Sequence, residues 1–600
     1  MLLMFPVFLL LGLFAPGYFV ARYLRHTLSW ASAFAISLLI LFYSVFWLGV
    51  FHVSITLWTV LPCLVAASAG AACLKKKSAA PATAERTPQW DTQDWILILS
   101  SGLVGAILLA RSAISPLIGF DTRFRWDFLA QRLLALGNFG FIPPLTPADF
   151  RNYFFVDGIP PLVSFTHWWL YASAGRYLPS LISIFVAAQF GCTLAFTFGA
   201  ASAVWSRRAG VVAAAILAAC PLYFRSVVLG QETGLTALAI AAMIYFVVTA
   251  HEQNDFPAMA SAGLAAALCA LAREYGWIAL IAGVIALLWR RRPLKEVFVF
   301  SAIATAAAAP WYVRNWILAG NPFYSLRFGN FAVNPIHDGI LLHYHAFLGV
   351  QHWTSSDWTG VLALLLVFAT LPLLAGIPGG IWCFRRHGYL IVIVLLLAAV
   401  WIQSAGYTSG GVGLSTRVLS PAMVVLSITG AGILEPLTRR PRWRAAMVAA
   451  IVLCQAWTAA QGALYPNNPF ALPLSQWPHN AFQRVREQTE FEIRDQLARI
   501  LPAGSRVLSD NAYLHAALIG KGIEVVPVWS PEVRFIFSSS PEESERQLSS
   551  LHIGSVAYYP QSLNTGYLVS ASPFYASLPQ RSRVLGQVPG FLYILVPKHP

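Results

Sequence analysis

Several charged side chains in this 600-residue sequence stand at the borders of long apolar segments, where a charge is costly to keep and therefore points to function. They come from distant parts of the chain: Asp121, Asp127, Glu232, Arg273, Glu274, Arg314 and Arg417. An arginine guanidinium is a planar, permanently charged fork that suits phosphate oxygens. A carboxylate accepts the proton of a hydroxyl nucleophile when burial or a neighbour raises its pKa. The set predicts a site for an anionic amphiphile at one bilayer surface.

Two of the carboxylates compete for the role of general base. Asp121 is flanked by Arg123 and Arg125, which we expect to hold its pKa low and make it the poorer base. Asp127, six positions further on, leads into an amphipathic stretch that suits a short helix lying against the membrane. We therefore expect Asp127 to be the base, with Asp121 and then Glu232 as alternatives.

Each of these residues also has a purely structural interpretation. Arg273 and Glu274 are adjacent and could pair with one another or with Glu232. Arg314 and Arg417 could extend to lipid headgroups without binding a substrate. The functional interpretation gains weight because the residues gather on one face rather than occurring singly.

Histidines in the segment 315–358 raise the question of a metal. His343 and His345 stand one residue apart, with His337 and Asp338 nearby. A His-x-His pair without a third spaced ligand is a weak metal signature. We expect no cofactor, with a divalent metal as the alternative.

The composition requires that these residues be positioned by a membrane protein. Hydrophobic residues make up 57% of the chain and charged residues 11%, with a mean hydropathy of +0.63. Soluble domains, disordered chains and secreted disulfide scaffolds are excluded by these values. All seven cysteines lie in apolar runs and none forms a CxxC pair, so neither a disulfide framework nor a zinc ribbon is indicated.

Apolar runs of bilayer-spanning length predict about 14 transmembrane helices. They cover residues 2–20, 29–50, 53–74, 94–113, 180–204, 209–229, 233–250, 257–273, 275–289, 296–314, 359–384, 388–405, 418–435 and 445–463. We divide the chain into N-terminal helices with a cytoplasmic loop (1–93), a transmembrane core (94–463) and a C-terminal domain (464–600).

Basic residues orient these segments. The short loops rich in Lys and Arg all follow odd-numbered segments: Arg22 and Arg25, Lys75 to Lys77, Arg207 and Arg208, Arg290 to Lys295, Arg385 and Arg386, and Arg439 to Arg444. The positive-inside rule places them in the cytoplasm. The long segments 114–179, 315–358 and 464–600 then lie on the exoplasmic side. The net charge of +15 is thus an orientation signal, and nucleic acid is not an expected partner.

The sequence of the C-terminal domain predicts a small α/β unit. Residues 506–510, 523–529, 555–559 and 591–596 predict strands. A helix is predicted to begin at Pro541, with Ser540 as its cap and acidic residues in its first turn. Because it contains no Cys and no nucleotide-binding glycine motif, we expect a lid or docking module without chemistry of its own.

The stretch from Pro310 to Tyr324, PWYVRNWILAGNPFY, resembles a segment of bacterial membrane glycosyltransferases of the type C superfamily. These are relatives of protein O-mannosyltransferases and of the lipid A aminoarabinose transferase. Further stretches are similar in order: Trp126-Asp127 with Gly158 to Pro161, Gly230 to Glu232, Arg273 to Gly276 and Thr416 to Pro421. The resemblance covers about 94–463, and three helices precede the core where many relatives have the large loop directly after the first helix.

The resemblance implies transfer of a sugar from a polyprenyl-phosphate donor to a hydroxyl or amine on a lipid, glycan or protein acceptor. It implies a multi-pass enzyme of the bacterial inner membrane, in contact with membrane lipids, with its active site on the periplasmic side. Arg314, Arg417 and Arg273 would stabilise the leaving phosphate. Glu232, Glu274, Asn315 and Tyr324 would support the site.

Two other functions remain open at this point. A transporter or flippase of a lipid-linked or acidic solute would place charges at the bilayer midplane on broken helices and show a repeated architecture, neither of which we see. A polysaccharide polymerase or ligase would share the lipid-linked donor and differ in its acceptor.

Overall fold

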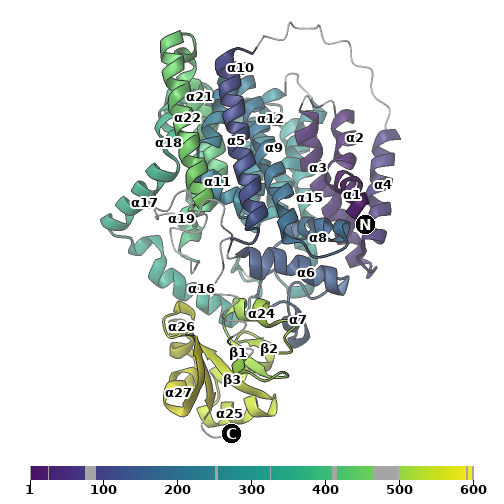
Figure 1. Ribbon diagram of the computed structural model, residues 1–600, viewed down its shortest axis with the longest axis vertical. Coiled ribbons are helices and arrows are strands. Elements are labelled where there is room, and N and C mark those ends of the chain that lie inside the picture. Colours follow the sequence, from purple (N-terminus) through teal and green to yellow (C-terminus); the bar gives the residue numbers. More distant parts are fainter. Residues whose placement is uncertain are drawn as a thin grey trace.

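Long helices run side by side in a bundle, and a small sheet domain sits at one end of it in the computed structural model (Figure 1). The structure describes residues 2–600 except 25, 27, 74–89, 120, 251–254, 325, 409–414, 465–495, 497–498, 589–591 and 598–600. The prediction for the loop with Lys75 to Lys77 lies outside these residues. We call the end of the bundle that carries the sheet domain the domain end.

The bundle helices fall into an N-terminal group and a core. The first group is α1 (Phe5–Leu13), α2 (Ala15–Tyr23), α3 (Ser29–Val50) and α4 (Leu57–Cys73). The core comprises α5 (Thr92–Ile114), α9 (Ile182–Val204), α10 (Arg207–Ala218), α11 (Pro221–Val228), α12 (Glu232–Thr249), α13 (Phe256–Ala272), α14 (Ile278–Trp289), α15 (Leu294–Ala319), α17 (Ser355–Phe368), α18 (Thr370–Trp382), α19 (Phe384–Ala405), α21 (Ser420–Thr438) and α22 (Pro441–Leu464).

The apolar segments predicted from the sequence all coincide with helices. Among the described residues, nine helices are long and apolar enough to cross a membrane, or up to eleven if each of two bent pairs is one span. The bends are 66° between α10 and α11, where Pro221 begins the second helix, and 101° between α17 and α18. Three further apolar helices are shorter. The fold class of a polytopic helical membrane protein with a small C-terminal sheet domain is confirmed, whereas the count of 14 crossings stays a prediction.

Arginines and carboxylates join three helices at the end of the bundle opposite the domain end (Figure 1). Asp91 caps α5 by accepting hydrogen bonds from the backbone N–H groups of the first turn. It also pairs with Arg444 of α22 at 2.8 Å and with Arg208 of α10 at 3.6 Å. Asp94 adds a second carboxylate to Arg444 at 2.8 Å. These basic loop residues therefore lie at the same end of the bundle.

Short helices at the domain end fill the segment 114–179. They are η2 (Thr122–Trp126), α6 (Asp127–Leu136), α7 (Pro147–Asn152) and α8 (Leu162–Ala174). Further short elements at this end are η4 (Glu274–Trp277), α16 (Pro335–Leu348) and η6 (Thr416–Leu419).

The sheet domain has five strands in the order β2-β1-β3-β5-β4, with β1 parallel to β2 and β3 and with β5 antiparallel to its neighbours. Its elements are β1 (Arg506–Ser509), α24 (Ala512–Leu518), β2 (Glu524–Pro527), η8 (Pro531–Phe537), α25 (Pro541–Ser550), β3 (Ile553–Tyr558), α26 (Leu563–Ala571), α27 (Pro573–Arg581), β4 (Ser582–Val588) and β5 (Leu592–Pro597). Ser540 caps α25, as predicted. The strand β4 was not predicted.

The sheet domain packs directly on the short helices of the domain end. Trp529, just after β2, donates a hydrogen bond from its indole to the carbonyl of Phe154 at 2.7 Å. Asn334 donates one to the carbonyl of Trp529 at 2.9 Å. The ring of Tyr513 on α24 lies 5.8 Å from that of Phe124 in η2. The domain thus contacts the element that carries Asp121 at its start.

Candidate active site at the domain end

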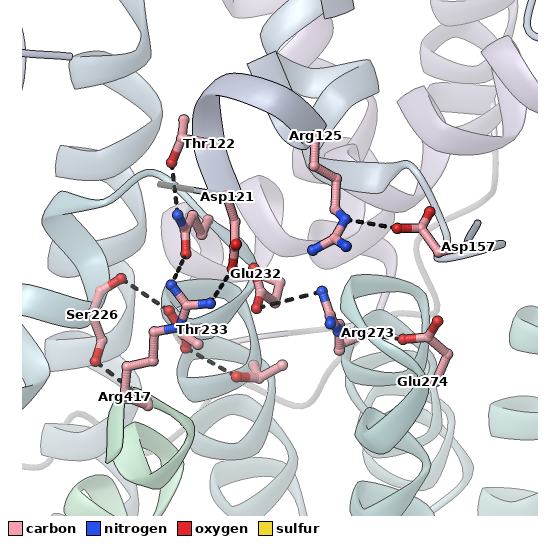
Figure 2. A network of polar contacts seen from close by, with 12 residues as sticks. Asp121, Thr122, Arg125, Asp157, Ser226, Glu232, Thr233, Arg273, Glu274 and Arg417 are labelled. Carbon is pink, nitrogen blue, oxygen red and sulfur yellow. Dashed lines mark hydrogen bonds and ion pairs between the residues drawn. The ribbon is translucent and has the colours of Figure 1, made fainter. Parts of the chain in front are cut away.

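Four elements bring charged residues together at the domain end (Figure 2). They are the start of η2, the first turn of α12, the start of η4 and the start of η6. The carboxylates and guanidiniums that meet there are Asp121, Glu232, Arg273, Glu274 and Arg417, which we call the charged cluster. All five were predicted as site residues, and they come from segments up to 296 positions apart.

Arg417 is the centre of one half of the charged cluster. Its guanidinium forms an ion pair with Asp121 and donates a hydrogen bond to the amide oxygen of Gln231 at 2.6 Å. The amide nitrogen of Gln231 in turn donates to the hydroxyl of Thr122 at 2.8 Å, and that hydroxyl donates to the carbonyl of Leu229. This chain of contacts fixes η2 against the turn before α12.

Arg273 is the centre of the other half. It lies 3.3 Å from a carboxylate oxygen of Glu274 and 3.8 Å from one of Glu232. Glu232 occupies the first turn of α12, where the helix dipole favours a negative charge. Among the described residues, Glu232 Oε2 and Arg273 Nη1 are buried without a hydrogen-bond partner. Arg273 Nη1 is also the atom that pairs with the other carboxylate oxygen of Glu232, at 3.8 Å, a distance too long for a hydrogen bond.

A buried ion pair lies behind the charged cluster. Arg125 donates from Nε to Asp157 at 2.8 Å, and the hydroxyl of Tyr153 donates to the same carboxylate at 3.0 Å. The guanidinium also lies over the ring of Phe155, 4.7 Å from its centroid. We did not predict Gln231, Arg125 or Asp157 as site residues, although each stands within two positions of a motif that the sequence analysis singled out.

The charges around Asp121 set its proton affinity. Burial would raise the pKa of this carboxyl, but the nearby Arg417, then Arg125 and Arg273, outweigh burial and lower the pKa to about 2. The sequence analysis expected a low value from Arg123 and Arg125; the structure assigns the main effect to Arg417. Asp121 is therefore a paired carboxylate in the ligand-free protein.

Asp127 lies apart from these arginines, in a pocket of uncharged donors. Its carboxylate accepts hydrogen bonds from the hydroxyl of Tyr171, from Tyr177 at 2.8 Å and from the amide of Gln131 at 2.7 Å. Burial raises its pKa, against the effect of these hydrogen bonds. The residue is 0% exposed, whereas the side chains of Asp121, Arg417 and Arg273 are 21%, 23% and 23% exposed. Asp121, Arg417 and Arg273 are therefore partly open to solvent, whereas Asp127 is not.

The other predicted site residues hold the loop between η2 and α8. Asn315 donates to the carbonyl of Gly158 at 2.7 Å, and Tyr324 donates to that of Pro144 at 3.1 Å. Arg314 donates to the carbonyl of Ile142 at 2.6 Å and lies over the ring of Phe139. The structure therefore does not bring Arg314, Asn315 or Tyr324 into the charged cluster.

The histidines of the segment 315–358 pack against aromatic rings. His343 lies beside Phe347 and Tyr567, and His345 beside Tyr407. His337 is buried near Trp529, and its neighbour Asp338 pairs with Arg327. Over the described part of the chain, no group of three or more His, Cys, Asp or Glu side chains is arranged to hold a metal ion.

Comparisons with known proteins agree with a glycosyltransferase architecture. Residues 159–313 match the model of the family described as dolichyl-phosphate-mannose-protein mannosyltransferase. No curated protein matches the sequence. The matching family model spans α8 to α15, the part of the core that contributes Glu232, Arg273 and Glu274.

Solved structures are similar over most of the chain. ArnT from Cupriavidus metallidurans bound to undecaprenyl phosphate is 12% identical, with a TM-score of 0.53, over 84% of this chain and 98% of that one. The apo state of the same protein gives 13% identity and a TM-score of 0.50 over 84% and 97%. The Archaeoglobus fulgidus oligosaccharyltransferase in its apo form gives 12% and 0.48 over 81% and 72%. The likeness to ArnT shows that this chain has the fold of the type C membrane glycosyltransferases.

Proposed function

We propose that the protein transfers a sugar from a polyprenyl-phosphate donor to a hydroxyl or amine acceptor at the domain end, and that this end faces the periplasm of a bacterial cell. The observation that carries the proposal is the charged cluster itself, in which the partly exposed guanidiniums of Arg417 and Arg273 lie beside the carboxylates of Asp121 and Glu232. The family model that matches residues 159–313 is named for a lipid-phosphate-linked sugar, and the ArnT structure contains undecaprenyl phosphate.

Arg417 and Arg273 are the proposed ligands of the donor phosphate. Both are partly exposed, and the carboxylate of Glu232 lies between them (Figure 2). Carboxylates pair with both guanidiniums, so a donor phosphate would compete with these carboxylates for them. The negative charge that grows on the leaving phosphate would then be stabilised by groups already in place.

Asp121 is the proposed general base, a role that the sequence analysis gave first to Asp127. The reason for the change is access, because Asp127 is fully buried among Tyr171, Tyr177 and Gln131. A donor phosphate that binds Arg417 would release Asp121 from its ion pair. Loss of that pairing raises the pKa of Asp121 and makes it able to take the acceptor proton.

Glu232 and Glu274 have a supporting role in this proposal. They hold Arg273 in position, at 3.8 and 3.3 Å, when the phosphate is absent. Two carboxylates on one guanidinium keep it from extending toward bulk solvent. Asn315 and Tyr324 act more remotely, through the backbone of the segment between α6 and α8.

The test uses the full-length protein in vesicles with a panel of radiolabelled polyprenyl-phosphate sugars and a membrane extract that supplies acceptors. Sugar transfer to a new product supports the proposal. Asp121→Asn and Arg417→Ala should reduce the product at least about tenfold, whereas Arg439→Gln, at the opposite end of the bundle, should not. Movement of intact donor across the bilayer without a new product would instead show a transporter.

A further inference from the structure

The sheet domain turns toward the bundle the edge at which its parallel strands end. β1 is parallel to β2 and to β3, so the carboxyl ends of the three strands lie at the same edge of the sheet. The stretches that follow these strands contact the domain end through Tyr513 after β1, Trp529 after β2 and Asn564 after β3. The carboxyl edge of the parallel strands therefore faces the bundle, with α24 and α26 on that side (Figure 1).

The chain leaves β1 and β3 in opposite directions across the sheet. From β1 it runs through α24 to β2, and from β3 it runs through α26 and α27 to β4 and β5 on the other side. In open α/β sheets, the space outside the carboxyl ends of two such strands is the usual place for a ligand. The polar residues at this point are Asp510, Asn511, Tyr513, Tyr559 and Asn564, which we call the switch-point cluster.

Asp510 is the charged member of the switch-point cluster. It directly follows β1 and is 6% exposed. Burial raises the pKa of its carboxyl to about 6, although a hydrogen bond from the amide of Asn564 lowers it. The carbonyl of Asn564 in turn accepts a hydrogen bond from the hydroxyl of Tyr344 on α16. A buried carboxyl of this kind is best matched by a ligand that offers hydrogen-bond donors.

Hydroxyl groups lie around Asp510. Its carboxylate adds to the rise that burial causes in the pKa of Tyr559 and of Tyr575, so both hydroxyls are within its electrostatic reach. In the part of the chain that the structure describes, Tyr575 Oη and Thr565 Oγ1 are buried without a hydrogen-bond partner. Buried hydroxyls normally have partners. A ligand that both donates and accepts hydrogen bonds would supply them.

Tyr513 connects the switch-point cluster to the charged cluster. It lies in the first turn of α24, three positions after Asp510, and its ring is 5.8 Å from that of Phe124 in η2. Burial raises the pKa of the Tyr513 hydroxyl, Arg123 lowers it and Asp121 raises it, so this hydroxyl is within electrostatic reach of the proposed base. A ligand that extends from Asp510 along the first turn of α24 would present its far end to Asp121.

The approach to Asp510 is lined by groups that form directional hydrogen bonds. Asn511, Tyr513 and Asn564 are partly exposed, whereas Asp510 is buried. A carboxylate accepts hydrogen bonds, and an amide or a phenol both donates and accepts them. The hydroxyl groups of a sugar complement this mixture, because each of them also donates and accepts. A phosphate or another anion would instead be repelled by the carboxylate of Asp510.

The strand order disfavours a peptide at the same place. An extended peptide commonly binds by adding a strand to a free sheet edge. β1 lies between β2 and β3, and β3 lies between β1 and β5, so neither strand has a free edge at the switch-point cluster. The recognition there depends on side chains, which favours a glycan.

We propose that the switch-point cluster binds the acceptor, and that the acceptor is a glycan with one sugar at Asp510 and Asn564 and its reacting hydroxyl at Asp121. This deepens the proposed function, which leaves the acceptor open among a lipid, a glycan and a protein. The place of the reacting hydroxyl rests on that function. Binding of a glycan at Asp510 does not.

Photolabelling in the absence of a sugar donor tests the proposal on the full-length protein. The probes are oligosaccharides released by mild acid from bacterial envelope glycans, each with a diazirine tag at its reducing end. Labelled peptides are mapped by mass spectrometry. We expect labelling of residues 511–513 and 559–564 that untagged oligosaccharide suppresses, and no labelling of these residues by the tag alone.

Three variants identify the contacts. Asp510→Asn should reduce the labelling about tenfold, because a neutral amide replaces a charged hydrogen-bond acceptor. Asn564→Ala, at a partly exposed position, should reduce it several-fold and serves as the second variant if Asp510→Asn does not fold. Glu543→Gln on α25, on the side of the sheet domain away from the bundle, is the matched carboxylate control and should have no effect (Figure 1). Melting curves check that each variant is folded.

The results that overturn the proposal are specific. Absence of labelling that oligosaccharide suppresses, or wild-type labelling of both folded variants, would exclude a glycan at Asp510. Labelling of the same residues by a tagged serine-containing peptide that oligosaccharide cannot displace would show a protein acceptor instead. Glycan binding at Asp510 without any sugar transfer would refute the proposed function alone. Sugar transfer without glycan binding there would refute this inference alone.

Discussion

The ion pair between Asp121 and Arg417 joins the proposed base to the proposed phosphate ligand. Each holds the other in the ligand-free protein, with the pKa of Asp121 lowered to about 2. A carboxylate with so low a pKa is a weak base. In the proposed mechanism this pairing would keep the site inactive until a phosphate competes for Arg417, which would tie proton removal to the presence of the donor.

Asparagine substitution distinguishes the two aspartates. Asp121→Asn keeps the shape of the side chain but cannot take a proton, so we expect transfer at saturating donor to fall at least about a hundredfold. Asp127→Asn should retain most transfer and lower the melting temperature instead, because its carboxylate accepts three hydrogen bonds in a buried pocket. Rates and melting curves of both variants are the measurement. An inactive Asp127→Asn beside an active Asp121→Asn would return the base to Asp127.

The pH dependence of transfer provides a second test of the pair. The acidic limb of the pH profile of kcat/KM reports the pKa of the base in the free enzyme, which is about 2 for Asp121. The acidic limb of the kcat profile reports the pKa of the same group in the donor complex. Since donor phosphate removes Arg417 as a partner, the pKa of Asp121 should be higher in the complex. We expect the acidic limb of kcat at higher pH than that of kcat/KM. Coincident limbs would mean that donor binding leaves the ion pair intact.

We expect Arg417 to contribute to transfer by binding the phosphate of the donor. Arg417→Ala should lower kcat/KM for the donor about ten- to a hundredfold, the effect of losing a charge-assisted phosphate contact of roughly 1.5–3 kcal/mol. Arg417→Lys should recover only part of this, because an ammonium lacks the planar fork. The measurement is the initial rate against donor concentration at equal protein levels. A wild-type value for the alanine variant would assign the phosphate elsewhere.

At the scale of elements, η2 carries Asp121 at its start and is held from three directions. Thr122 bonds the turn before α12, Phe124 contacts α24 of the sheet domain, and Arg125 pairs with Asp157 in the loop before α8. The last contact is buried, with the two side chains 7% and 4% exposed. Positioning of the proposed base thus depends on residues that never need to touch a substrate.

The buried pair predicts an asymmetric mutational effect. Asp157→Ala leaves the Arg125 charge buried without its partner and should destabilise the protein by about 3–5 kcal/mol. The double variant Arg125→Met with Asp157→Leu removes both charges and should recover a large part of that loss. Denaturation midpoints of the full-length protein measure both. A double variant as unstable as the single one would show that shape, rather than charge, is what the pair contributes.

The elements were largely predictable from the sequence because a bilayer requires long apolar helices. The predicted segments all coincide with helices, and the resemblance to the type C fold is confirmed. The bend of 101° between α17 and α18 and the strand β4 were not predicted, since hydropathy reports composition and not direction. Among the residues, Asp121, Glu232, Arg273, Glu274 and Arg417 meet as expected. The position of Arg314 was not predictable, because it depends on which face of α15 meets α3.

At the scale of the whole molecule, the basic loop residues and the charged cluster lie at opposite ends of the bundle. Arg207, Arg208 and Arg444 gather around Trp90 and Asp91 at one end, while the charged cluster and the sheet domain lie at the other (Figure 1). The positive-inside rule assigns the basic end to the cytoplasm. In a bacterial inner membrane the domain end would then face the periplasm, where lipid-linked sugars meet their acceptors.

Fusion reporters test this orientation. Alkaline phosphatase fused after Pro600 should be active, because it folds only after export, and green fluorescent protein at the same place should stay dark. Fusions after Arg440, between α21 and α22, should show the reverse, since the basic ends of three helices meet there. Equal expression is checked by immunoblot. If the fusion after Pro600 is inactive while that after Arg440 is active, the molecule is inverted, and the charged cluster would face the cytoplasm. The proposed reaction would then have to draw its donor from the cytoplasmic leaflet, so this result bears on function as well as on topology.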